Sequence, residues 1–108
     1  MGQITFDEFQ KLDFKVGYVL KAEKIDGAQK LVKLEVDIGT EKRQVVTGGA
    51  EVYSLEEYIG KRMIILTNLK PAKIRGVESE GMVLAADVDN QPVFPVFPEN
   101  VPQGAKVR

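Results

Sequence analysis

Residues 62–86 read RMIILTNLKPAKIRGVESEGMVLAA, in which two apolar runs are separated by a polar connector. The runs at 63–66 and 82–86 are typical of strands that lie centrally in a sheet and are buried on both faces. The connector contains a proline, two glycines and three cations. These cations are Lys70, Lys73 and Arg75. We therefore expect a loop that joins two buried strands and presents positive charge, for which a phosphate polymer is a natural partner because each contact releases a counterion.

Composition excludes several kinds of chemistry. The 108 residues suit one domain, and a content of 44% hydrophobic and 29% charged residues is ordinary for a globular protein. No apolar run approaches the length of a membrane span and no export signal is present, so we expect a cytoplasmic protein without a membrane partner. Cysteine and histidine are both absent, which removes the usual nucleophiles, bases and transition-metal ligands. We expect no catalytic site, no metal and no cofactor.

Charge is segregated along the sequence. The net charge of −1 is unlike that of most nucleic-acid-binding domains, which are basic overall. Acidic residues concentrate at 7–8, 51, 56–57 and 87–89, whereas the three cations of the connector lie within six residues of one another. Any binding of a polyanion must therefore depend on this local cluster.

The hydrophobic pattern predicts five strands and two short helices. Thr5 with Glu8, and Ser54 with Glu57, have the spacing of capping boxes, which predicts a helix at 6–11 and another that ends near Gly60. Alternating or continuous apolar residues predict strands at 14–23, 31–38, 43–47, 62–66 and 82–86. An antiparallel hairpin joins the second and third strands. Five strands with a helix between the third and fourth match the OB-fold, an all-β Greek-key barrel.

A proline-rich tail follows the fifth strand. Four of the five prolines lie at 90–108, interleaved with the apolar residues of 93–97. Proline disfavours central strands while apolar side chains favour burial, so we expect an extended tail packed across its own barrel or a partner's. We divide the chain into an N-terminal helical extension (1–12), the barrel (13–89) and a C-terminal extension (90–108). Residues 93–97 are predicted to form the contact of a homodimer.

Three motifs together resemble a known family. They are DFKVG at 13–17, QVVTG at 44–48, and NLKP at 68–71 followed by RG at 75–76, ES at 78–79 and GM at 81–82. Their order and spacing resemble the tRNA-binding domain of methionyl-tRNA synthetases, free-standing tRNA-binding proteins and the endothelial-monocyte-activating polypeptide group. Two positions depart from the family pattern: residues 25–29 read IDGAQ instead of HPNAD, and Thr47 replaces a serine.

The resemblance implies an OB-fold that holds the outer corner of tRNA by its shape and backbone rather than its base sequence. Members with a single module typically form homodimers. Because the chain has no nucleotide-binding motif, we expect a non-catalytic domain or subunit of methionyl-tRNA synthetase that assists aminoacylation in cis or in trans. Its expected partners are tRNA, a second copy and the catalytic body of the synthetase. A free-standing tRNA-binding protein and an export-related chaperone of the same fold remain alternatives.

The cationic connector supplies the first candidate site residues. Lys70, Lys73 and Arg75 are predicted to contact tRNA phosphates, the alternative being a solvated loop. Asn68 and Ser79 flank these cations; they either cap turns through backbone hydrogen bonds or donate to phosphate or ribose.

The strands supply further candidates. Lys15, Lys30, Lys33, Lys42 and Arg43 lie on or between the first three strands, where OB-folds commonly bind, and among them we select Lys33 and Arg43. Met82 is predicted to lie in the core. The tyrosines are also predicted to be core residues rather than platforms for base stacking. They are Tyr18, Tyr53 and Tyr58.

Overall fold

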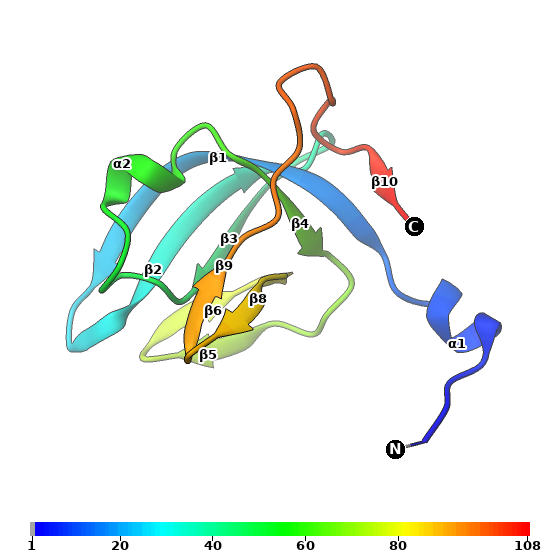
Figure 1. Cartoon of the computed structure of the whole chain (residues 1–108), viewed down its shortest axis with the longest axis horizontal. Coiled ribbons are helices and arrows are strands. Elements are labelled where there is room, and N and C mark those ends of the chain that lie inside the picture. The colour runs from blue at the N-terminus through cyan, green and yellow to red at the C-terminus, as the bar shows by residue number, and fades with distance from the viewer. Residues whose placement is uncertain (1) are drawn as a thin grey trace.

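Strand β1 (Phe14–Ile25) is the centre of the fold in the computed structural model, which describes residues 2–108 (Figure 1). It pairs antiparallel with β2 (Ala28–Asp37) on one edge and with β4 (Arg62–Leu66) on the other. Where β2 ends, β10 (Lys106–Val107) continues the same edge of β1. Strands β3 (Lys42–Thr47) and β7 (Met82–Val83) complete the order β3-β2-β1-β4-β7.

The two predicted helices are confirmed, but only one has the predicted cap. Helix α1 (Phe6–Gln10) begins with a complete capping box, in which Glu8 N donates to Thr5 Oγ1 at 3.1 Å. Helix α2 (Leu55–Tyr58) lies between β3 and β4, and its N-cap Ser54 makes no side-chain hydrogen bond, so the second capping box is wrong. Within residues 2–108, no helix is long and apolar enough to cross a membrane.

The core fills the barrel with side chains from both halves of the chain. Leu34, Met63 and Ile65 are buried in it, and so is Tyr58, whose hydroxyl donates to Gly48 O at 2.9 Å. Burial raises the pKa of Tyr58 to about 12. Its ring lies 5.7 Å from that of Tyr53, and Tyr53 packs against the core. The prediction that these two tyrosines are core residues is confirmed.

The proline-rich tail crosses its own barrel, as expected. Phe94 packs against the core beside Tyr53 and Tyr58. Further along, Phe97 N donates to Arg62 O at 2.9 Å, and the chain ends by pairing with β1 through β10. The tail is therefore part of the fold of a single chain.

The predicted fifth strand differs most from the structure. Only Met82 and Val83 pair with β4, and the following residues form the hairpin of β8 (Ala86–Val88) and β9 (Gln91–Val93). Val83 points inward, whereas the side chains of Met82 and Leu84 remain 41% and 37% exposed. Burial on both faces was wrong for this strand because alternate side chains lie on opposite faces, and only the face of Val83 points into the core of the barrel. The core assignment of Met82 is wrong for the same reason.

Gly17 on β1 leaves space for the side chain of Ile65 on β4. A Cβ at this position would lie 2.5 Å from Cγ1 of the fully buried Ile65. We expect Gly17→Ala to lower the free energy of unfolding by about 1–3 kcal/mol, because the packed core has no space for the methyl group. Urea unfolding measures this change. Gly48→Ala is the control, since its nearest contact would be at 3.8 Å, and an equal loss in both variants would contradict the steric explanation.

Candidate nucleic-acid interface

The cationic connector forms a hairpin rather than an irregular loop. Strands β5 (Ala72–Ile74) and β6 (Val77–Ser79) pair antiparallel, with Lys73 opposite Glu78. The turn residues Arg75 and Gly76 both have positive φ, 53° and 80°, as in the type I′ turns that suit the twist of a hairpin. We call residues 68–79 the cationic arm. Its side chains Lys70, Lys73 and Arg75 are all exposed.

The arm packs against the end of the β1–β2 hairpin. Ile74 and Val77 of the arm contact a small buried cluster of Ile25, Ala28 and Val46. This apolar contact brings the β4–β7 connection beside the β1–β2 turn, and these are the two loops that OB-folds use to bind oligonucleotides.

Arg75 consequently lies among cations of the β1–β2 hairpin. It lines one hollow of about 320 Å³ together with Lys24 and Lys33, whose lining also includes the acidic Glu23 and Asp26. It lines another hollow of about 480 Å³ together with Lys30. Lys24 was missed by the sequence analysis, because only the packing of one hairpin on another brings it near the arm. Its position two residues before the Asp26-Gly27 turn could have indicated that Lys24 is exposed near this loop.

The cations of this region differ in their pairing. The Nζ of Lys33 lies 3.4 Å from a carboxylate oxygen of Glu23, and their side chains are 33% and 60% exposed. Within residues 2–108, no ion pair shorter than 4.0 Å involves the three cations of the arm. Exposed ion pairs are weak, so a phosphate can compete with Glu23 for Lys33.

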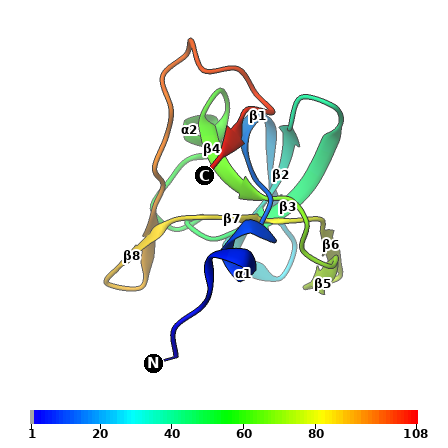
Figure 2. The same cartoon turned by 90° about the vertical axis from the view of Figure 1, so that its right-hand side faces the viewer.

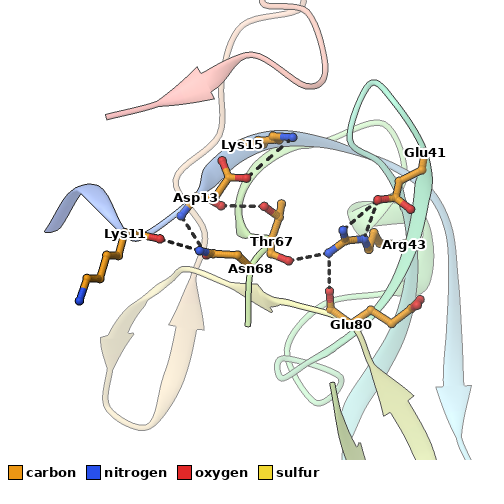
Figure 3. Close-up of polar contacts among 8 residues, drawn as sticks. All are labelled: Lys11, Asp13, Lys15, Glu41, Arg43, Thr67, Asn68 and Glu80. Atoms are coloured by element: carbon orange, nitrogen blue, oxygen red, sulfur yellow. Dashed lines mark hydrogen bonds and ion pairs between the residues drawn. The ribbon is translucent and has the colours of Figure 1, made fainter. Parts of the chain in front are cut away.

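Asn68 and Ser79, at the two ends of the arm, bind the protein's own backbone. Asn68 Oδ1 accepts from Asp13 N at 2.9 Å, and its Nδ2 donates to Lys11 O (Figure 3). Ser79 is only 4% exposed; its Oγ accepts from Val46 N at 3.0 Å and donates to Gly81 O at 2.9 Å. Of the two roles considered for these residues, this geometry supports the structural one.

Arg43 points to the base of the arm instead of into solvent. Its Nη1 donates to Thr67 O at 2.6 Å and to Glu80 O at 3.1 Å, while Nη2 lies 2.8 Å from Glu41 Oε1 (Figure 3). Its side chain is 24% exposed. Lys33 therefore lies beside a cation of the arm, Arg75, whereas the guanidinium of Arg43 bonds to groups of the protein itself.

The tyrosines offer no platform beside these cations. Tyr53 and Tyr58 lie in the core with Phe94. Tyr18 lies under the guanidinium of Arg62, 4.8 Å from its ring centroid. This interface thus presents positive charge on exposed side chains, which suits phosphates more than bases.

A family model and a curated relative each match most of the chain. A family model described as "Putative tRNA binding domain" matches residues 14–106. The methionine-tRNA ligase of Archaeoglobus fulgidus is 50% identical over 105 residues, which make up 97% of this chain and 16% of that protein. The chain thus spans about one sixth of the length of this curated relative.

Two solved structures share the fold over nearly the whole chain. A MetRS related protein from Pyrococcus horikoshii superposes with a TM-score of 0.94 and 48% identity, covering 100% of both chains. The chaperone CsaA from Bacillus anthracis superposes with a TM-score of 0.87 and 26% identity, covering 99% of this chain and 100% of that one. The predicted OB-fold is confirmed by these neighbours.

Ser79 provides a test of the structural role. We expect Ser79→Ala to lower the free energy of unfolding by about 1–3 kcal/mol, because Val46 N would lose its acceptor in a buried place. Urea unfolding measures the loss. Lys73→Ala, which changes an exposed side chain of the same hairpin, should stay within about 0.5 kcal/mol of the parent protein. An unchanged stability of Ser79→Ala would contradict the structural role.

Proposed function

Because this chain belongs to the tRNA-binding domain family, we propose that it is a module that holds tRNA by its sugar-phosphate backbone. The observation that supports this most directly is the packing of the cationic arm on the β1–β2 hairpin, which gathers Lys24, Lys30 and Lys33 around Arg75. Lys70 and Lys73 extend this group along the arm. Each of these cations can neutralise one phosphate and release its counterion.

The distribution of charge in space supports the same role. The β5–β6 and β8–β9 hairpins lie on opposite sides of the barrel (Figure 2). The first carries Lys73, Arg75 and one acid, Glu78, and the second carries Asp87 and Asp89 without a Lys or Arg. A chain of net charge −1 thus has one end suited to a polyanion.

Recognition of the backbone explains why the module would not select a base sequence. Phosphates are the same along every tRNA, so contacts to them position the protein without reading the bases. The three candidate phosphate ligands of the arm are long, exposed side chains, and Tyr53 and Tyr58 are used in the core. Different tRNAs should therefore bind with similar affinity.

In this proposal the chain assists aminoacylation without taking part in its chemistry. The relatives that it matches are methionine-tRNA ligases several times its length. A tRNA-binding module attached to the catalytic body, or associated with it as a separate subunit, would raise the effective concentration of tRNA at that body. A free-standing tRNA-binding protein would use the same interface.

A chaperone is the second candidate, favoured by the likeness to CsaA over nearly the whole chain. A chaperone would bind unfolded polypeptide through apolar contacts, which high salt does not weaken. Binding that falls steeply with salt distinguishes the tRNA-binding module from this alternative.

We expect tRNA affinity to fall with salt, with a log-log slope of roughly −3 to −5 if four to six phosphates are neutralised. Replacing Lys70, Lys73 and Arg75 together by Ala should weaken the binding of different tRNAs alike and make the slope shallower by about 2 to 3. Filter binding of total tRNA, duplex RNA and single-stranded DNA across a salt series measures both effects.

The control removes the same charge elsewhere. Lys21, Lys42 and Lys61 lie outside the arm and the β1–β2 turn, and Lys21 and Lys42 each pair with Glu35. Their triple Ala variant should keep most of the affinity. An affinity independent of salt, or a loss confined to one tRNA, would exclude the proposed mode of binding.

The proposal includes a homodimer, and the structure offers a more exposed contact than the tail. Of residues 93–97, Phe94 is used in the core, which leaves Val93 and Val96 outside, 48% and 51% exposed. On α1, Phe6 is 69% exposed, and just before the helix Ile4 is 64% exposed. We place the dimer contact at α1.

The chemistry of this surface supports a second copy as its partner. Phe6 and Phe9 line a hollow of about 320 Å³ together with Lys106 and Arg108. The first turn of α1 carries the acidic residues Asp7 and Glu8. Two copies related by a two-fold axis can therefore pair apolar side chains with each other and acids with cations, as a self-complementary interface requires.

Light scattering tests the dimer and its location. We expect a dimer at micromolar concentration, and we expect Phe6→Ser to shift it to a 12.0 kDa monomer because the most exposed apolar ring is removed. Val96→Ser, an equally polar change on the tail, should leave the dimer intact. A parent protein that is monomeric would overturn the dimer, and dissociation by Val96→Ser alone would move the contact to the tail.

A further inference from the structure

The two ends of the cationic arm meet at one guanidinium group. Thr67 comes immediately before the arm and Glu80 immediately after it, and the carbonyl oxygens of both accept from Nη1 of Arg43, at 2.6 and 3.1 Å (Figure 3). Arg43 itself belongs to β3. The ladder of β4 and β7 begins next to these two residues, with Leu66 opposite Met82, and beyond it a single side chain bonds to both ends of the arm.

Glu41 holds this guanidinium in place. Its Oε1 accepts from Nη2 at 2.8 Å and from Nε at 3.3 Å. Together with the two bonds from Nη1, four of the five N–H groups of Arg43 have partners within the protein. The positive charge of Arg43 is matched by a carboxylate, so little of it remains for a phosphate.

The rest of the arm's base is fastened differently on its two sides. On the outgoing side, Glu80 N donates to Gln44 O at 2.8 Å, and Gln44 N donates to Glu80 Oε1 at 3.0 Å. On the incoming side, Asn68 binds the segment that joins α1 to β1. Of these side chains, Arg43 is the one that bonds to both sides.

We propose that Arg43 is a positioning residue for tRNA binding, acting through the direction of the cationic arm and not through contact with phosphate. This inference rests on the proposed function. If the arm is free to move, only a fraction of molecules presents its cations beside the β1–β2 turn, and the apparent affinity falls by that fraction. The number of phosphates neutralised stays the same, so the salt dependence does not change.

The variant that tests this is E41Q/R43Q, which removes the clamp and keeps the net charge. We expect tRNA affinity to fall about tenfold, as it would if about one tenth of the molecules held the arm in place. We expect an unchanged slope against salt. Trypsin should cut faster after Lys73 and Arg75 in the folded variant, whereas Lys70 is protected by the following proline. Urea unfolding checks that the variant is folded.

The matched control is E35Q/K42Q, which removes the 3.9 Å ion pair between β2 and β3 together with the 4.0 Å pair of Glu35 and Lys21, also without a change of net charge. It should bind tRNA and resist trypsin like the parent protein. An E41Q/R43Q variant that behaves like this control would overturn the positioning role, while the parent's steep salt dependence would still support tRNA binding. Loss of salt dependence in the parent protein itself would instead overturn the proposed function.

The single variant Glu41→Gln keeps the proposal testable if the double variant fails to fold, since the Glu41 side chain is 53% exposed. Under the positioning role, loosening Arg43 speeds tryptic cleavage of the arm. Cleavage no faster than in the parent protein would overturn the proposal.

Discussion

A barrel closes only if the first and last strands of its sheet are connected. In this protein, hydrogen bonds made by side chains provide much of that connection. Strands β3 and β7 lie at the two ends of the sheet order. They are connected through Ser79, which is buried and accepts from Val46 N, and through Glu80, which exchanges hydrogen bonds with Gln44. These groups lie directly beside the cationic arm. The same contacts therefore close the barrel and position the arm.

Much of the fold was predictable from the sequence because its signals are local. Alternating apolar residues predicted the strands that form β1 and β2, and the short polar connector after the second strand predicted the β2–β3 hairpin. The spacing of Thr5 and Glu8 predicted the cap of α1. The same spacing at Ser54 and Glu57 does not produce the bond. The apolar residues at 82–86 have no distinguishing pattern, so neither the short length of β7 nor the exposure of Met82 was visible in them.

The candidate site was predictable where charge alone marks it. Lys70, Lys73 and Arg75 stand out as cations between glycines and a proline, and all three are exposed. Lys24 joins them only through the packing of Ile74 and Val77 on the β1–β2 hairpin, which no local pattern encodes. In the sequence, Arg43 looks the same as an arginine on a strand that binds phosphate. Its contacts with the carbonyl groups of Thr67 and Glu80 could not be predicted, because they join residues that are distant in the sequence.

The opposed hairpins place charges of opposite sign on opposite sides of a chain whose net charge is −1. The cations of β5–β6 and the carboxylates of β8–β9 lie on opposite sides of the barrel. The electric field of a polyanion orients such a molecule before the two come into contact. More encounters therefore begin with the cationic side facing the polyanion. The acidic end repels a second strand at the same time. A nearly neutral protein can in this way associate as fast and in as defined an orientation as a basic protein. It binds nucleic acids non-specifically less than a basic protein does.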